Sequence, residues 1–104
     1  MRLLPDFKEK YMCKINKPVI DIAATAANIK ACRIRAGYSV REIQNIFNFN
    51  APQAIYNWES GKDVPSIDNL IVIAAVYGVT IDKIVITTTV EVEVETNIRE
   101  VKSA

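Results

Sequence analysis

Residues 39–61, SVREIQNIFNFNAPQAIYNWESG, constrain the fold of this chain most strongly, because they predict two short helices joined by a tight turn. Ser39 and Glu42 have the spacing of a capping box, in which each side chain satisfies a free amide of the first helical turn. The first helix should therefore begin at Val40. Its apolar residues then fall on one face: Val40, Ile43, Ile46 and Phe47.

The second helix of this pair should lie at about residues 51–59. Asn48 and Asn50 tolerate the backbone of a tight turn, Pro52 suits the first turn of a helix, and Gly61 marks its end. Its buried stripe has the i, i+3, i+4, i+7 spacing: Ala51, Ala54, Ile55 and Trp58.

The opposite side of the second helix is polar but uncharged. Its members are Gln53, Tyr56, Asn57 and Ser60. Exposed helix faces usually carry Lys and Glu, whereas amides and a phenol suit hydrogen bonds to base edges, since Gln and Asn match N6 and N7 of adenine in the major groove. An ordinary solvated face is the commoner explanation of such a pattern when it stands alone.

The length of 104 residues, half of them apolar, suits one small domain with tails. The longest apolar run, LIVIAAVYGV, is too short to span a membrane, and the first residues lack the apolar segment of a signal peptide. We therefore expect a cytoplasmic protein.

Positive and negative charges are unevenly distributed along the chain. Residues 1–20 contain five Lys or Arg and two Asp or Glu, residues 21–86 contain six of each, and residues 87–104 contain two and four. A neutral central region attracts phosphate weakly. Any DNA binding should therefore depend on a local patch and on two copies of the domain.

Metal centres and enzymatic chemistry find little support in the sequence. There is no histidine, and Cys13 and Cys32 form no CxxC pattern, so we expect no metal, no cofactor and no catalytic residues. Cys32 suits the core. Cys13 is either an inert thiol, which a reducing cytoplasm favours, or a redox thiol.

Three more helices should complete the domain. The alanine-rich segment from Asp21 to Ala36 should form a helix, with Asp21 in its first turn and Gly37 as its C-terminal cap. One side of that helix is lined by Ile22, Ala26, Ile29 and Cys32 or Arg33. Ser66 and Gly78 bracket a fourth helix, and Thr80 begins a short fifth one.

The fourth helix is apolar nearly all round. Its expected core stripe is Ile67, Leu70, Ile71, Ala74 and Tyr77. Val72 and Ala75 extend the apolar surface beyond this stripe. Another subunit or one of the tails should therefore cover this helix.

The two tails carry different patterns. In TTTVEVEVETN, Val90, Val92 and Val94 alternate with glutamates, which predicts a strand. This strand should pair with residues 1–20 or with its own copy in a dimer, since an isolated strand is not stable. Residues 1–20 form a basic N-terminal arm, for which a strand, a segment lying along phosphates and a solvated tail are all open interpretations.

Three segments together resemble the helix-turn-helix regulators of the lambda-repressor-like (Xre/Cro) family. IKACRIRAGYSVREI resembles the first helix, glycine turn and second-helix opening; AIYNWESGKDVPSIDNL the recognition helix and proline-containing link; VYGVTIDKI the last turn and fifth helix. The resemblance covers about residues 21–86. It implies an all-α, five-helix domain that binds double-stranded DNA as a homodimer, with residues 87–104 as a C-terminal tail.

Two positions depart from the family pattern. Asn48 stands near the usual glycine, in a turn that is one residue longer. Gln44 stands where the family prefers a small residue, because the two helices cross closely there.

The resemblance also implies roles for individual residues. Base contacts would come from Gln53, Tyr56 and Asn57. Positioning or phosphate contacts would come from Asn50, Arg41 and Lys62, with Gln44 as a further candidate. Structural support would come from Trp58 and from an ion pair between Arg33 and Glu59, which stand at the family's tether positions. Lys30 and Arg35 suit phosphate contacts and ordinary solubilising charges equally well.

The leading hypothesis is therefore a sequence-specific, non-enzymatic DNA-binding transcriptional regulator, most simply a repressor. The alternative is an antitoxin or adaptor that keeps the same fold and engages a protein partner through its tails. No membrane association is expected.

Overall fold

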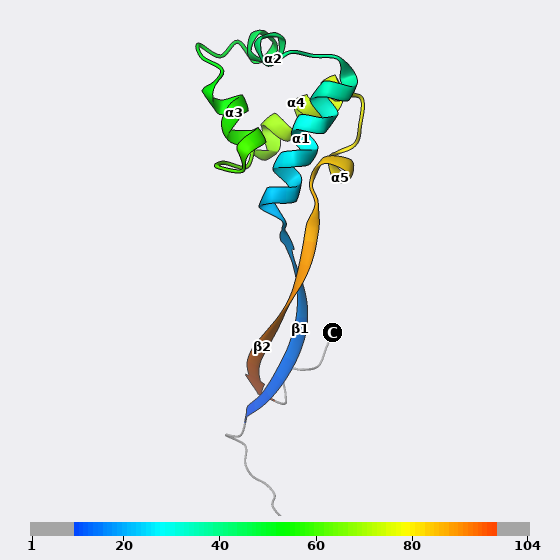
Figure 1. Ribbon diagram of the computed structural model, residues 1–104. Coiled ribbons are helices and arrows are strands. Elements are labelled where there is room, and N and C mark those ends of the chain that lie inside the picture. The colour runs from blue at the N-terminus through cyan, green and yellow to red at the C-terminus, as the bar shows by residue number, and fades with distance from the viewer. Residues whose placement is uncertain (1–9, 98–104) are drawn as a thin grey trace, which may run out of the picture. The chain divides into compact units, whose positions relative to one another are not determined.

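The computed structural model describes residues 10–97, which form five helices and two strands (Figure 1). In chain order they are β1 (Lys10–Ile20), α1 (Ile22–Ala36), α2 (Val40–Phe47), α3 (Gln53–Ser60), α4 (Ile67–Tyr77), α5 (Ile81–Ile84) and β2 (Thr87–Asn97). The chain divides into a helical unit, Ile20–Thr88, and a strand unit that contains the remaining parts of β1 and β2. The predicted fold class, a five-helix domain with β-forming tails, is confirmed.

Capping residues set the ends of the first two helices. Asp21 precedes α1 as its N-cap rather than lying in its first turn, and its Oδ1 accepts a hydrogen bond of 3.0 Å from the Ala24 amide. Gly37 ends α1 in the left-handed region at φ 88°. The capping box of α2 is complete, with bonds of 3.1 Å from the Glu42 amide to Ser39 Oγ and 2.7 Å from the Ser39 amide to Glu42 Oε1.

The turn between α2 and α3 is where a sequence-based boundary was wrong. Helix α3 begins at Gln53 rather than at residue 51, and Pro52 is its N-cap instead of lying in its first turn. Proline disfavours helical backbone in the residue before it, so Ala51 stays outside the helix and is exposed rather than buried. Asn48 adopts the left-handed φ of 57° that its position near the usual glycine requires.

All the helices contribute side chains to one hydrophobic core. The core contains Ile29, Cys32, Ile43, Ile55, Trp58, Leu70, Ile73, Ala74, Tyr77 and Ile84. The Trp58 ring meets Phe47 and Phe49 edge-on, at centroid distances of 5.4 Å and 6.0 Å. This aromatic cluster joins α3 to α2 and to the turn between them.

The buried stripe of α4 differs from the predicted one. Ile67 and Ile71 are 61% and 55% exposed, and Ile73 takes their place in the core beside Leu70 and Ala74. Both stripes satisfy the helical period, so periodicity alone could not choose between them. Ile22 and Ile46 are likewise exposed rather than buried.

In the strand unit, β1 and β2 pair in a two-stranded antiparallel sheet (Figure 1). The C-terminal tail therefore pairs with the N-terminal arm of its own chain, which was one of the two predicted pairings. The part of the arm before residue 10 lies outside the described residues. Four described side chains of the strand unit are large, apolar and exposed: Met12, Ile15, Val90 and Val94.

The described part of the chain contains neither a helix that could span a membrane nor a cluster of potential metal ligands. None of its helices combines the length and the apolar character that crossing a membrane requires. Residues 10–97 also hold no group of three or more potential metal ligands.

Replacing Tyr77 by Phe should leave the free energy of unfolding at neutral pH unchanged or raise it by about 1 kcal/mol. Among the described residues, the buried Tyr77 hydroxyl has no hydrogen-bond partner, and a buried unsatisfied hydroxyl is unfavourable. Burial also raises the pKa of Tyr77 from 10.0 to about 12. Between these pH values the unfolded chain releases this proton and the folded chain keeps it, so wild-type stability should fall as pH rises.

Urea denaturation of both proteins at pH 7 and at pH 11 measures this effect. The stability difference between variant and wild type should grow at the higher pH. A difference that does not change with pH would contradict the assignment.

Candidate functional site

The polar side of α3 faces away from the core, as the sequence predicted. Ile55 and Trp58 are buried beneath the helix. The outward side consists of Gln53, Tyr56 and Ser60, which are exposed, and Asn57, which is half-buried. The result is a helical surface with amide and hydroxyl groups directed to solvent and no charged side chain among them.

A chain of hydrogen bonds runs along this outward side. Gln53 Nε2 donates to Asn57 Oδ1 at 2.9 Å, and Asn57 Nδ2 donates to Asp63 Oδ2 at 3.2 Å. The backbone amides of Lys62 and Asp63 both donate to the Asn57 carbonyl, at 3.0 Å and 3.2 Å. Asp63 was not among the site residues predicted from the sequence, because its proximity to Asn57 depends on the left-handed turn at Gly61, where φ is 84°.

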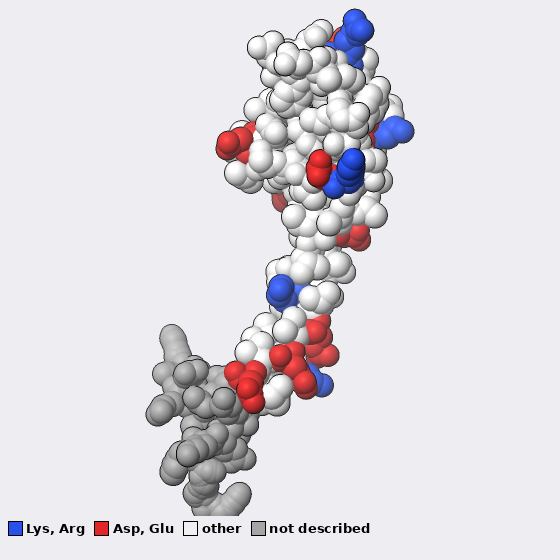
Figure 2. Space-filling model, turned by 90° about the vertical axis from the view of Figure 1, so that its left-hand side faces the viewer, with Lys and Arg blue, Asp and Glu red and all other residues white. Residues whose placement is uncertain are grey.

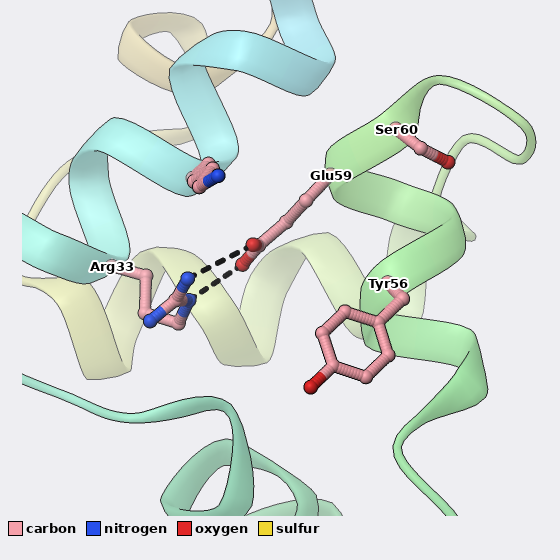
Figure 3. Close-up of a pocket in the computed structure, with 5 residues that line it drawn as sticks. Arg33, Tyr56, Glu59 and Ser60 are labelled. Atoms are coloured by element: carbon pink, nitrogen blue, oxygen red, sulfur yellow. Dashed lines mark hydrogen bonds and ion pairs between the residues drawn. The ribbon is translucent and has the colours of Figure 1, made fainter.

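The predicted ion pair between Arg33 and Glu59 is present and joins α1 to α3 (Figure 3). Arg33 Nε lies 2.6 Å from Glu59 Oε2, and Arg33 Nη2 lies 3.0 Å from Glu59 Oε1. The two side chains are only 11% and 6% exposed. Arg33 Nη1 also donates to the Tyr38 carbonyl at 2.9 Å. The hydrogen bond to Glu59 raises the pKa of Arg33 above its ordinary value, although burial acts in the opposite direction.

An open hollow of about 260 Å³ lies between α1 and α3. Its lining residues are Lys30, Arg33, Tyr56, Glu59 and Ser60. Figure 3 shows Tyr56 projecting from α3 on the side of the ion pair. Tyr56 therefore lies on the flank of the outward side nearest α1, and Lys30 is the lining residue whose charge is not matched by this ion pair.

The remaining candidates occupy separate positions in the helical unit. Arg41 is exposed in the first turn of α2, Asn50 is exposed in the turn before α3, and Lys62 is exposed directly after Gly61. The half-buried Gln44 donates from Nε2 to the Phe49 carbonyl at 3.2 Å. Its side-chain amide therefore stabilises the turn between α2 and α3 and does not project into solvent.

On the face of the helical unit that Figure 2 shows, charged side chains are few and scattered. Small groups of Lys, Arg, Asp and Glu stand on a largely uncharged surface, without a broad basic patch. The strand unit differs, because acidic side chains of β2, which carries Glu91 and Glu93, gather on it. The outward side of α3 thus offers hydrogen-bonding groups in weakly charged surroundings.

Comparison with solved structures finds a similar fold in the crystal structure of the DNA-binding domain of BldD. The TM-score is 0.54 at 18% sequence identity, and the match covers 62% of this chain and 93% of the BldD chain. At this identity the similarity shows the fold alone. A search of curated proteins finds no match to this chain.

The region of the chain that matches a known family contains all three segments on which the resemblance was based. Residues 29–84, more than half of the chain, match the helix-turn-helix family. The match runs from the second half of α1 to the last residue of α5 and thus contains the whole outward side of α3. The chain therefore belongs to the helix-turn-helix family of the Xre/lambda-repressor-like type.

Proposed function

We propose that this protein is a transcriptional regulator, acting as a repressor, that binds specific sites in double-stranded DNA through the outward side of α3. The observation that carries the proposal is the row of uncharged hydrogen-bonding side chains on α3, in a chain of the helix-turn-helix family. The domain name of the structural neighbour, a DNA-binding domain, supports it further.

The surface of α3 favours base reading over general phosphate binding. Gln53 and Asn57 offer paired donors and acceptors that suit the N6 and N7 edge of adenine. Tyr56 would contact the DNA on the flank nearest α1. Arg41, Asn50 and Lys62 would contact or position the phosphate backbone on either side of α3.

Because the protein attracts DNA phosphates only weakly, its affinity for DNA must have a second source. The formal net charge is only +1, so a single copy would gain little from counterion release. We propose that the protein binds DNA as a homodimer in which two copies of α3 enter successive major grooves about 34 Å apart. The exposed apolar side chains of the strand unit would supply the dimer contact.

Selection from a pool of random duplex DNA tests the proposed function most directly. Recovery of a two-fold symmetric sequence would support both specific binding and the dimer. A pool without enrichment after repeated rounds would contradict the proposal.

Replacing Gln53 or Asn57 by Ala should change which sequences are bound. Each lost bidentate contact should lower affinity by about 1 to 3 kcal/mol at one base pair of the selected site, and the fold should remain intact because both side chains reach the surface. Lys62→Ala should instead weaken binding to all sequences alike. It should also reduce the slope of log affinity against log salt concentration by about one. Titrations of the selected site and its single-base variants at several salt concentrations separate the two effects. Wild-type binding by both amide variants would show that the base-reading residues are misassigned.

A protein-binding antitoxin or adaptor is the second candidate function. The observation that favours it is the strand unit, whose exposed Met12, Ile15, Val90 and Val94 offer an apolar surface outside the helix-turn-helix segment. A stable complex with a different protein, together with a failed DNA selection, would favour this candidate over the first.

A further inference from the structure

Asp63 forms two hydrogen bonds with Asn57, a residue on the outward side of α3. Asp63 lies outside α3, in the loop after Gly61, yet its Oδ2 accepts a hydrogen bond from Asn57 Nδ2 at 3.2 Å. Its backbone amide is also bound to the Asn57 carbonyl, at 3.2 Å. Side chain and backbone thus hold the carboxylate beside one of the proposed base-reading residues.

A carboxylate accepts hydrogen bonds and, when ionised, cannot donate them. Asn57 must therefore present its NH₂ group to Asp63, which leaves its carbonyl oxygen for Gln53. Because that oxygen also only accepts, Gln53 must present its own NH₂ group to Asn57, as the 2.9 Å bond records. One carboxylate thereby determines the orientation of two amides in succession.

This orientation determines what the surface offers to a base. Gln53 keeps its Oε1 as a free acceptor, and each amide keeps one N–H beyond the bond it donates within the chain. Without the carboxylate, either amide could rotate by half a turn and exchange donor for acceptor at nearly the same energy. A surface that exchanges donor and acceptor fits more than one base pair, whereas a fixed pattern fits fewer.

We propose that Asp63 is a specificity-determining residue, which fixes the amide orientation of Asn57 and, through it, of Gln53. The proposal rests on the proposed DNA-binding function. Asp63 itself need not touch a base. Its negative charge lowers the attraction of this surface for phosphate, so its contribution is to discrimination between sequences rather than to affinity.

Asp63→Asn tests the proposal, because it keeps the size of the side chain but can both donate and accept. Its matched control is Asp68→Asn, which makes the same charge change at an exposed residue in the first turn of α4. Affinities of wild type and both variants are measured for the selected site and for all its single-base variants at one salt concentration.

Both variants should bind all duplexes somewhat more tightly, because each removes one negative charge. Only Asp63→Asn should also lower discrimination, by roughly fivefold or more, at the one or two base pairs that Gln53 and Asn57 read. Unchanged discrimination in Asp63→Asn would overturn the proposal, and so would the same loss in Asp68→Asn.

A measurement without DNA separates failure of this proposal from failure of the proposed function. In the NMR spectrum of the free protein, the side-chain NH₂ signals of Asn57 and Gln53 should move in Asp63→Asn and stay in place in Asp68→Asn. Signals that do not move would overturn the chain of hydrogen bonds from Gln53 through Asn57 to Asp63, even if DNA binding is specific. If the wild type selects no DNA site, the specificity role is overturned with the proposed function. The NH₂ signals would still show whether this chain of hydrogen bonds exists.

Discussion

Glu59→Ala should lower the free energy of unfolding by about 3 to 5 kcal/mol. The substitution leaves the guanidinium of Arg33, which is 11% exposed, without its two bonds to Glu59 and with only the Tyr38 carbonyl at 2.9 Å. Arginine keeps its charge at any accessible pH, so the protein cannot avoid the loss by releasing a proton. Urea denaturation of the variant and the wild type measures the difference.

Two further substitutions show whether the loss comes from the uncompensated charge. Glu59→Gln keeps the shape and part of the hydrogen bonding but removes the negative charge, so its loss should be intermediate. Replacing both residues, as in Arg33→Met with Glu59→Leu, should recover much of the stability, since well-packed apolar residues often replace a buried ion pair without loss. A loss below about 1 kcal/mol for Glu59→Ala is typical of an exposed pair and would contradict burial of this one.

Removing the strand unit should lower the affinity for the selected DNA site by about 10²- to 10⁴-fold. A chain of residues 20–88 retains the whole hydrophobic core, including Ile84, and the bonds of 2.9 Å and 3.2 Å between Thr25 Oγ1 and the backbone of Ile86. It should therefore keep its helical content. If the strand unit forms the dimer, this shortened chain would bind DNA half-sites one at a time. It would then lose the affinity that two joined domains gain by binding both half-sites together.

Sedimentation at micromolar concentration, circular dichroism and DNA titration together check this result. Full-length variants give a matched comparison on β2: Val90→Glu with Val94→Glu changes exposed apolar residues, whereas Glu91→Gln with Glu93→Gln changes the alternate residues of the same strand. Only the first pair should dissociate the dimer. A shortened chain that stays dimeric and keeps its affinity would show that another surface forms the dimer, for which the exposed Ile67 and Ile71 on α4 would be the next candidates.

Local sequence signals determined the number and order of the helices. The capping box at Ser39 and Glu42 and the glycine at position 37 act within one or two turns of chain, so their effect can be read without tertiary structure. The alternating valines of β2 predicted its strand for the same reason. The polar outward side of α3 was also evident, because the helical period separates it from the apolar residues.

Resemblance to the family contributed what local signals could not. The partnership of Arg33 and Glu59 joins residues 26 positions apart on two helices, and no local pattern predicts it. The family spacing placed both residues at tether positions, and the structure contains their ion pair.

Tertiary structure alone decided which of several equivalent local patterns is used. On α4 the burial of Ile73 instead of Ile67 and Ile71 depends on the direction from which the other helices pack, because the sequence is apolar nearly all round. The partner of β2 was equally open, since backbone hydrogen bonding does not distinguish the arm of the same chain from a second copy. The contact between Asp63 and Asn57 depends on how the chain turns after α3, and the bonds from Thr25 to Ile86 depend on how the two ends of the helical unit meet. Sequence patterns act over a few residues, whereas these choices depend on atoms that only the folded chain brings together.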